Sequence, residues 1–413
     1  MMRTFPVSKV LIIPSWYPSA DSPMNSVFIP EQARALARRF EVAVLTPRFP
    51  SLGDTLRLRW GSALMRENHE GIDTWRVRKL KIPTLRRWIP GNLFPDHAMV
   101  FYRKFAAAIR CGFGHYVQRC GLPDIIHAHV VLPGGWIAVE LAEQFGIPIV
   151  LTEHSEPFSM HLTSPRQEAL VREVLTRVNR ISAVSPTLRK TIHAFCPGVP
   201  IDVIGNLIET DFFVPAERHA VLGAPFRFFF LGFLTKRKGV QHLFQAVQML
   251  LADGFNRFDV VVGGDGPYRS FLTKHARDLR IEKHIRFLGL LDRTNVRDQM
   301  QACDVFVLPS LGETFGVVLG EAMACGKPVL STLCGGPQDV VTPETGILVP
   351  PANAPALAHA MAEFLKRQFS FHPQVIRASV TERFGAASFL KKIEQFYADT
   401  IRDHRPRKPA QSA

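Results

Sequence analysis

The stretch that decides the fold runs from Asp304 to Thr332 and reads DVFVLPSLGETFGVVLGEAMACGKPVLST. It opens with a short apolar run, DVFVLPS, which predicts a buried strand. A helix is predicted over GVVLGEAMACG, because Gly326 and Pro328 are typical residues for its end. The next apolar run, KPVLST, predicts a second strand. Two strands joined through a helix form a βαβ unit, which favours a parallel sheet.

Two carboxylates within this unit, Glu313 and Glu321, raise the question of function. Glu313 falls in the loop before the helix, and Glu321 falls inside the helix. The helix N-terminus between them offers unpaired N–H groups and a partial positive charge, which suit a phosphate. Carboxylates suit the vicinal hydroxyls of a sugar, since they accept several hydrogen bonds. Taken alone, the pair is more typical of a first-turn acid and a solvated acid on an ordinary helix.

The alternation of strand and helix extends to both sides of this unit. Upstream in the same half, the apolar runs FRFFFLGFL, FDVVVGG and HIRFLGLL predict strands. In the first half of the chain, KVLIIP, EVAVLTP, PDIIHAHV and IPIVLTEH predict strands in the same way. The pattern lapses between the two halves. The sequence therefore predicts an α/β fold with two doubly wound, Rossmann-like domains.

The domain boundaries follow from this lapse. An N-terminal domain is predicted over residues 1–208, a linker over 209–224 and a C-terminal domain over 225–386. A C-terminal helix at 387–403 is expected to pack back on the N-terminal domain, and the tail 404–413 is expected to be disordered. Residues 52–115 fit the alternation less well, and we interpret them as a hairpin followed by a helix from about Asp96.

The pattern E-x7-E over Glu313–Glu321 closely resembles that of retaining glycosyltransferases of family 4, which adopt the GT-B fold. The resemblance continues through GFLTKRKGVQHLFQAV, VVGGDGPYRSFL, HIRFLGLLDRTNV, STLCGGPQDVV and TGILVPP, in the family's order. It is looser over PDIIHAHV, IPIVLTEH, SAVSPTL and VIGNLIETDFF in the first half. It implies two Rossmann-like domains that face a central cleft, with the acceptor on the N-terminal side and a nucleotide-sugar on the C-terminal side.

The resemblance also implies roles for individual residues. Glu321 is expected to hold the ribose hydroxyls of the donor, and Glu313 is expected to hold the transferred sugar. Lys238 is expected to pair with the diphosphate, although a lysine in a basic loop is commonly only solvated. Glu313 and Lys238 are counted as catalytic. The other donor-binding candidates are Thr314, Phe315, Gly316, Val317, Arg237, Gly232, Leu288, Ser26 and His154.

Two of the departures from the family pattern concern the phosphates of the donor. Phe233 stands where the family commonly has an arginine that binds phosphate, so Arg237 is a candidate substitute. Ser26 stands in a loop where the family usually has glycine, which bears on how closely the backbone there approaches the phosphates.

His129 is the candidate catalytic residue of the first domain. His127 and His129 share one face of the strand PDIIHAHV, because side chains alternate along a strand. His129 is nearer the carboxyl end, where ligands bind in open α/β sheets. A zinc site is disfavoured, since H-x-H lacks a third ligand nearby. A buried, hydrogen-bonded histidine is the alternative, and the resemblance matches His129 to the family's catalytic histidine. His154 is a second candidate by the same logic.

The expected chemistry needs no cofactor. No Asp-x-Asp motif follows a predicted strand in a convincing context, so no catalytic metal is expected. Lys238 and the helix N-terminus would stabilise the charge on the leaving group instead. The resemblance implies retention of anomeric configuration, with attack on the face from which the phosphate departs. The expected protein is thus a metal-independent, retaining hexosyltransferase whose donor is a nucleotide-diphosphate-sugar.

The net charge of +14 points to an anionic partner. No nucleic-acid recognition motif is found, so nucleic acid is not expected as a partner. Basic residues between Arg57 and Arg87 alternate with Trp60, Trp75 and Trp88, which favours an anionic membrane surface. Core tryptophans beside a solvated basic face are the alternative. The expected acceptor is a glycan, a lipid-linked molecule or another anionic molecule, in cell-surface polysaccharide or glycolipid synthesis.

Location and competing functions complete the expectations. No apolar run approaches the roughly 18 residues that span a bilayer, and the six cysteines show neither metal-ligand nor C-x-x-C spacing. A cytoplasmic location is expected, with peripheral attachment to the inner face of the membrane as a further option. The alternatives are an inactive nucleotide-sugar-binding or anionic-polymer-binding protein and a GT-B epimerase or phosphorylase. Glu313, Glu321, Lys238 and His129 together favour transfer.

Overall fold

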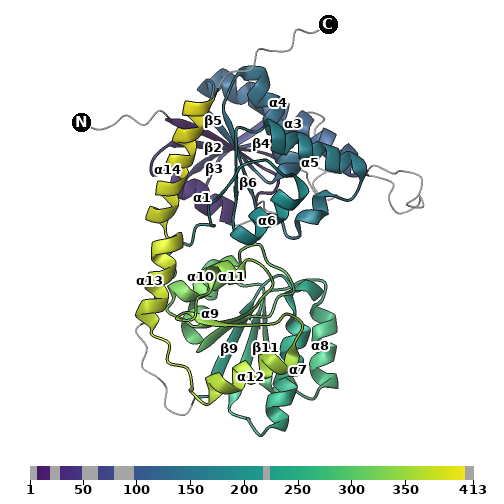
Figure 1. Ribbon diagram of the computed structural model, residues 1–413, viewed down its shortest axis with the longest axis vertical. Coiled ribbons are helices and arrows are strands. Elements are labelled where there is room, and N and C mark those ends of the chain that lie inside the picture. Colours follow the sequence, from purple (N-terminus) through teal and green to yellow (C-terminus); the bar gives the residue numbers. More distant parts are fainter. Residues whose placement is uncertain (1–6, 19–27, 49–63, 79–96, 217–223, 405–413) are drawn as a thin grey trace. The chain divides into compact units, whose positions relative to one another are not determined.

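The computed structural model describes residues 7–18, 28–48, 64–78, 97–216 and 224–404, and it divides into two compact units (Figure 1). Unit 1 comprises Met1–Val184, Arg189–Ile204 and Leu390–Ala413, and unit 2 comprises Ser185–Leu188 and Gly205–Phe389. The main division therefore falls at Gly205, and the described part of the expected linker, 209–216, belongs to unit 2. The expected tail, 404–413, lies outside the described residues except for His404.

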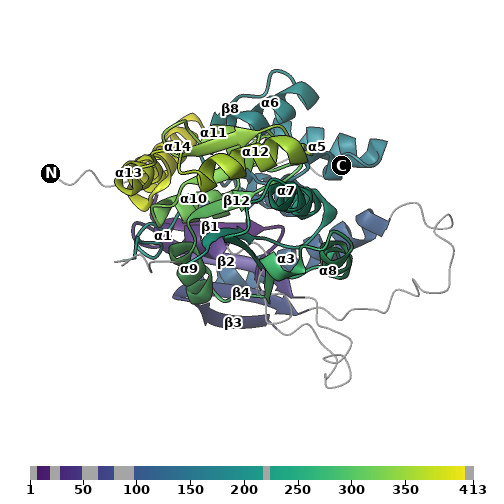
Figure 2. The ribbon, with the colours of Figure 1, turned by 90° about the horizontal axis from the view of Figure 1, so that it is seen from below.

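Unit 1 contains an eight-stranded sheet in the order β3-β4-β2-β1-β5-β6-β7-β8. The strands are β1 (Lys9–Pro14), β2 (Glu41–Arg48), β3 (Leu64–His69), β4 (Ile72–Arg78), β5 (Ile125–His129), β6 (Ile149–Glu153), β7 (Arg180–Ala183) and β8 (Ile201–Val203). The apolar runs form strands because helices cover the sheet, and β5 and β6 are buried at every residue. All neighbours pair in parallel except β3 and β4, which form an antiparallel hairpin at one edge (Figure 2).

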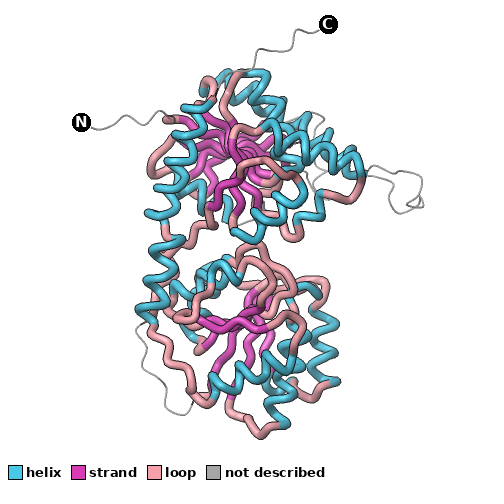
Figure 3. The backbone as a smooth tube through the Cα atoms, viewed as in Figure 1, coloured by secondary structure: helices cyan, strands magenta, loops and turns pink. Residues whose placement is uncertain are grey.

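Helices lie outside the strands in unit 1 (Figure 3). They are α1 (Phe28–Leu36), α3 (His97–Cys120), η2 (Val131–Gly135), α4 (Trp136–Phe145), η3 (Phe158–His161), α5 (Pro165–Arg177), α6 (Pro186–Phe195) and α14 (Ala386–Asp403). The start of α5 shows why the chain turns helical there. The hydroxyl of Ser164 accepts the backbone N–H of Gln167 at 3.3 Å, and Pro165 suits the first helical position.

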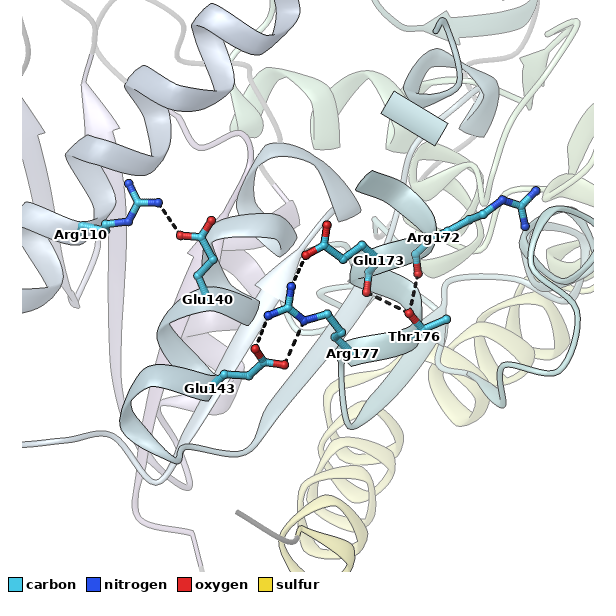
Figure 4. Close-up of polar contacts among 7 residues, drawn as sticks. All are labelled: Arg110, Glu140, Glu143, Arg172, Glu173, Thr176 and Arg177. Atoms are coloured by element: carbon cyan, nitrogen blue, oxygen red, sulfur yellow. Dashed lines mark hydrogen bonds and ion pairs between the residues drawn. The ribbon is translucent and has the colours of Figure 1, made fainter. Parts of the chain in front are cut away.

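Ion pairs connect the outer faces of three of these helices (Figure 4). Arg177 on α5 pairs with Glu143 on α4 and with Glu173 on its own helix, and Arg110 on α3 pairs with Glu140 on α4. Partly exposed pairs of this kind contribute about 0–1 kcal/mol each. The buried apolar face of α4 therefore does more than these charges to hold the helices on the sheet.

The hairpin of β3 and β4 decides one of the open alternatives. Trp75 in β4 is 1% exposed and packs against Tyr116 of α3, with ring centroids 5.6 Å apart. Its indole N–H donates to Asp73 at 3.0 Å. Trp75 is therefore a core residue, and the expectation of a membrane-facing role is wrong for it. Trp60, Trp88 and the basic residues Arg57, Arg86 and Arg87 lie outside the described residues.

Unit 2 contains a six-stranded parallel sheet in the order β11-β10-β9-β12-β13-β14. The strands are β9 (Phe226–Leu231), β10 (Phe258–Gly263), β11 (Ile285–Gly289), β12 (Val305–Leu308), β13 (Val329–Thr332) and β14 (Gly346–Val349). The chain starts in the middle, adds two strands on one side and then adds three on the other, as in doubly wound nucleotide-binding folds. The central position of β9 explains its three fully buried phenylalanines, Phe228, Phe229 and Phe230.

The helical segments of unit 2 follow its strands in turn. They are η4 (Lys236–Lys238), α7 (Val240–Ala252), α8 (Arg269–Asp278), η5 (Glu282–His284), α9 (Arg293–Ala302), α10 (Val317–Ala324), α11 (Pro337–Val340), α12 (Ala354–Leu365) and α13 (Pro373–Phe384). In this βα alternation, β12, α10 and β13 correspond to the stretch Asp304–Thr332. The predicted βαβ unit is therefore confirmed.

Each sheet has one place where the strand order reverses, and ligands bind outside the carboxyl ends of the strands at such a place. In unit 1 this place lies between β1 and β5, and in unit 2 it lies between β9 and β12. His129 is the last residue of β5, Lys238 follows β9, and Glu313 follows β12. The topology therefore places all three predicted catalytic residues at the reversal points of their own units.

Candidate active site

The candidate site in unit 1 centres on His129. Its side chain is fully buried, and its Nδ1 lies 2.9 Å from Nε2 of His154, which follows β6. Burial lowers the pKa of His129 to about 3, because desolvation penalises the charged ring. Within the described part of the chain, no hydrogen-bond partner reaches Nε2 of His129. A neutral, buried imidazole with one nitrogen left over can exchange a hydrogen bond with a substrate hydroxyl.

His127 packs directly against His129, with ring centroids 4.2 Å apart. Its Nε2 lies 2.8 Å from the hydroxyl of Thr152, and its Nδ1 lies 2.7 Å from the hydroxyl of Tyr397 in α14. Burial and then the neighbouring histidines His129 and His154 keep the pKa of His127 well below its ordinary value. His127 is therefore the hydrogen-bonded core histidine of this face, whereas His129 keeps a nitrogen for other partners.

The backbone next to His129 is strained. Val130 has φ 73°, a region that β-branched residues rarely adopt. Its N–H donates to the carbonyl of Thr152 at 2.9 Å, and its carbonyl accepts the N–H of Gly135 at 3.0 Å. Such a conformation persists only where surrounding contacts enforce it. The strand end that carries His129 is therefore held in one defined conformation.

Glu153 ties the two histidine loops together. Its carboxylate is fully buried and accepts the N–H of Val131 at 2.8 Å, beyond the end of β5. It also accepts the N–H groups of His154 and Ser155, at 2.9 and 2.7 Å, beyond the end of β6. Three N–H donors satisfy a buried carboxylate without a cation. Glu153 therefore positions the backbone of both loops.

The candidate site in unit 2 joins the segment after β9 to the loop after β12. Nζ of Lys238 lies 2.5 Å from Oε1 of Glu313, and the hydroxyl of Ser310 donates to the same oxygen at 2.7 Å. The lysine and glutamate side chains are 22% and 11% exposed. In such a partly buried place, charges interact more strongly than on an open surface.

Close backbone packing holds this ion pair in place. Gly239, directly after Lys238, has φ 70°, and a Cβ there would lie 1.8 Å from the carbonyl oxygen of Pro309. Only glycine fits such a position. The N–H of Leu311 also donates to the carbonyl of Arg237 at 2.8 Å. The segments that carry Lys238 and Glu313 are therefore in direct contact along their backbones.

The loop before α10 is equally confined. Gly316 precedes the helix with φ 85°, and Val317 begins it. A Cβ at Gly336 would lie 2.3 Å from backbone atoms of Thr314 and Phe315, so the two segments lie against each other. Inside the helix, Glu321 is only 8% exposed. This burial excludes the alternative of a fully solvated acid on the helix surface.

Glycines line the carboxyl ends of β9, β10 and β11. A Cβ at Gly264 would lie 2.0 Å from the carbonyl oxygen of Gly232, and the N–H of Gly264 donates to the carbonyl of Gly289 at 2.7 Å. Leu288 is half-buried in β11. Phe233, beside Gly232, is 63% exposed. This chain therefore presents an apolar ring where the resemblance leads one to expect a phosphate-binding arginine.

The described residues contain no group of three or more histidine, cysteine, aspartate or glutamate side chains that could hold a metal ion. None of the helices there combines the length and apolarity that crossing a membrane requires.

Two family models match consecutive stretches of the chain. The one described as Glycosyltransferase Family 4 matches residues 26–212, and the one described as Glycosyl transferases group 1 matches residues 217–382. The chain belongs to glycosyltransferase family 4. It is a glycosyltransferase with the GT-B fold, as the sequence predicted.

Curated relatives of this family 4 protein are similar over most of their length. TuaC of Bacillus subtilis (strain 168), named as a teichuronic acid biosynthesis glycosyltransferase, is 29% identical over 408 residues, which cover 94% of this chain and 98% of TuaC. The N-acetyl-alpha-D-glucosaminyl L-malate synthase of Bacillus anthracis is 27% identical over 321 residues, which cover 75% of this chain and 83% of the synthase.

Solved structures share the fold. Sucrose-phosphate synthase from Thermosynechococcus elongatus matches with a TM-score of 0.73 and 20% identity, over 95% of this chain and 99% of the synthase. HepE of Anabaena, in complex with UDP, matches with a TM-score of 0.71 and 18% identity, over 95% of this chain and all of HepE. At such identities the likeness shows the fold alone.

The structure places the predicted site residues of this family 4 enzyme in two groups. His129 and His154 form a hydrogen-bonded pair in unit 1. Lys238 and Glu313 form an ion pair in unit 2. The other predicted residues of unit 2 lie on the segments that follow β9 and β12, at the end of β11, or in α10: Gly232, Arg237, Leu288, Thr314, Phe315, Gly316, Val317 and Glu321. Ser26 lies outside the described residues.

Three residues that position the site were not predicted from the sequence: Glu153, Ser310 and Tyr397. For Glu153 there was a usable signal, since a lone acid at the end of an apolar strand needs internal donors when the strand is buried. Ser310 and Tyr397 gave no such signal. Serine is common in loops, and Tyr397 reaches His127 from 270 positions away.

Proposed function

We propose that this enzyme transfers a hexose-type sugar from a nucleotide-diphosphate-sugar with retention of anomeric configuration. The observation that carries the proposal is the ion pair of Lys238 and Glu313 at the strand-order reversal of unit 2. Ligands of doubly wound sheets bind at this point. The pair and Glu321, which is buried in the following helix α10, provide one cation and two carboxylates, and these groups suit a ligand made of a diphosphate and sugar hydroxyls.

Each residue receives a role from its chemistry. Lys238 provides positive charge for the diphosphate, both when the donor binds and when the phosphate departs. Glu313, in the adjacent loop, accepts hydrogen bonds from the transferred sugar. Glu321, buried in α10, accepts hydrogen bonds from the ribose. We assign His129 to the transfer step, because its Nε2 is a buried and unpaired hydrogen-bonding atom within the described chain.

The proposed reaction needs no metal ion. The acceptor hydroxyl attacks on the face from which the phosphate leaves, and the departing phosphate takes the acceptor's proton. Lys238 and the N–H groups at the start of α10 stabilise the negative charge of the leaving group. Transfer that continues unchanged in excess chelator would support this part of the proposal, and loss of transfer that Mg²⁺ restores would contradict it.

The acceptor is proposed to be a glycan or a lipid-linked molecule, in polysaccharide or glycolipid synthesis. The name of TuaC refers to teichuronic acid biosynthesis, and its similarity over 94% of this chain supports an acceptor in polysaccharide synthesis. The net charge of +14 supports an anionic acceptor or an anionic membrane surface as a partner. Sedimentation with anionic and neutral vesicles at low salt tests the membrane part, and protein that stays in the supernatant with both would contradict it.

The test of the donor is thermal stabilisation by a panel of nucleotide-sugars. A ligand at 100 times its dissociation constant adds about 2.7 kcal/mol to stability. The donor found in this way is then incubated with candidate acceptors, and the anomeric configuration of the product is determined by NMR. Donor binding without transfer to any acceptor or to water would favour an inactive nucleotide-sugar-binding protein instead. An inverted product would contradict the retaining mechanism.

A further inference from the structure

The donor site contains its own competitor for Lys238. Nζ of Lys238 lies 2.5 Å from Oε1 of Glu313, closer than a typical hydrogen bond between neutral groups. The hydroxyl of Ser310 donates to the same oxygen at 2.7 Å. A diphosphate that approaches Lys238 must therefore compete with the carboxylate of Glu313, which is already paired with this lysine.

This pair is a built feature, because the backbone holds both partners. On the lysine side, Gly239 packs against Pro309 so closely that a Cβ would not fit. On the glutamate side, the N–H of Gly336 donates to the carbonyl of Glu313 at 2.7 Å. The lysine and the carboxylate cannot separate by movement of one loop alone without breaking these contacts.

We propose that Glu313 makes the donor site select nucleotide-sugar over free nucleoside diphosphate by competing for Lys238. This inference rests on the proposed function. When a diphosphate takes over the lysine, Glu313 keeps its negative charge and loses its cation. A partly buried carboxylate that keeps only the hydroxyl of Ser310 and has no cation beside it is unfavourable, and it also repels the incoming phosphates.

A donor that carries a sugar compensates for this loss, and the product nucleotide does not. Sugar hydroxyls can donate hydrogen bonds to Glu313 at the moment when Lys238 turns to the diphosphate. A nucleoside diphosphate brings no such donors, and its terminal phosphate carries additional negative charge because it is no longer esterified. The same residue would therefore favour donor binding and promote product release.

The test compares the wild type with Glu313→Gln by titration calorimetry. The first probe is inorganic pyrophosphate, which carries no nucleobase. The other two probes are the nucleotide-sugar that stabilises the wild type and the corresponding nucleoside diphosphate. We expect Glu313→Gln to bind pyrophosphate at least about tenfold more tightly, since removing the carboxylate releases Lys238, and tenfold corresponds to about 1.4 kcal/mol. The preference for nucleotide-sugar over nucleoside diphosphate is expected to fall by at least the same factor.

Three further variants separate charge from structure. Glu344→Gln removes a carboxylate from an exposed position of unit 2 before β14, and it is expected to keep the wild-type preference. Lys238→Met is expected to lose most pyrophosphate affinity. Glu313→Asp keeps a carboxylate but withdraws it by one methylene group, and it is expected to fall between wild type and Glu313→Gln. It also serves as the test if Glu313→Gln does not fold.

Two results would overturn the inference. One is that pyrophosphate binds the folded Glu313 variants no more tightly than it binds the wild type, or that it binds neither the wild type nor the variants. The other is a preference for nucleotide-sugar that survives Glu313→Gln. If no nucleotide-sugar binds the wild type, the proposed function is wrong, and the pyrophosphate titrations alone still decide whether Glu313 competes for Lys238.

Discussion

Acidification is expected to destabilise unit 1 through His129, and the direction follows from its burial. The folded-state pKa of this histidine is lowered from 6.5 to about 3, because its ring is fully buried. Between these two pH values His129 is protonated in the unfolded chain but stays neutral in the folded state. The contribution of neutral His129 to the free energy of unfolding is therefore fully present above pH 6.5, and it is lost as the pH falls below 6.5.

The size of the effect does not depend on the folded-state pKa as long as that value lies well below 5. Each pH unit below 6.5 removes about 1.4 kcal/mol per buried neutral histidine. Lowering the pH from 7 to 5 should therefore lose about 2 kcal/mol through His129. In the variant His129→Gln this contribution disappears. The wild type is thus expected to lose about 2 kcal/mol more than the variant over this pH change.

The measurement is urea unfolding at pH 7 and pH 5, followed by tryptophan fluorescence. The five tryptophans of the chain all fall in the part of unit 1 before Val184, so the signal reports on unit 1. The control is His193→Gln, whose side chain is exposed on α6 and whose pH dependence should follow the wild type. Equal losses in wild type and His129→Gln would mean that the folded state accepts the proton, and the assignment of His129 as a buried neutral imidazole would be refuted.

Three other substitutions test single contacts. Glu321→Ala should weaken binding of the nucleotide-sugar by tenfold or more with little loss of secondary structure, and equal affinities by calorimetry would remove Glu321 from the donor site. Tyr397→Phe should cost about 1–3 kcal/mol, because it leaves a buried nitrogen of His127 without its hydroxyl partner; Tyr116→Phe is the matched control, and equal stabilities of the two would show that the contact is energetically silent. Gly239→Ala should destabilise unit 2 by about 2 kcal/mol or more, since its Cβ would overlap the carbonyl of Pro309; a stable variant with unchanged donor affinity would contradict the close packing.

Much of the fold could be predicted because short apolar runs bounded by glycine and proline are reliable strand signals in a parallel sheet. The runs KVLIIP and DVFVLPS correspond to β1 and β12. The hairpin and the helix expected from about Asp96 correspond to β3, β4 and α3. The main division between the units falls at Gly205, and the described part of the expected linker, 209–216, belongs to unit 2, where Thr210 and Phe213 are buried.

The site was predictable only in part, for physical reasons. Glu313 and Lys238, which the proposed chemistry requires, stand after predicted strands, but only the resemblance to the family distinguished them from ordinary solvated side chains. Their mutual contact depends on backbone approach between distant segments, and no local pattern encodes it. Glu153 was recognisable as a lone acid at the end of an apolar strand, but the three N–H groups that satisfy its carboxylate come from two loops, and no local pattern identifies them.

The C-terminal helix has a consequence for how the protein is made. Tyr397 belongs to unit 1 but is synthesised after the whole of unit 2. Domains usually fold in the order in which they leave the ribosome. In this chain, all of unit 2 is synthesised before the part of α14 that belongs to unit 1, which begins at Leu390. His127, and the ring of His129 that packs on it, therefore reach their final surroundings only after Tyr397 has been synthesised, so that a translation product truncated before Tyr397 lacks this part of the candidate site.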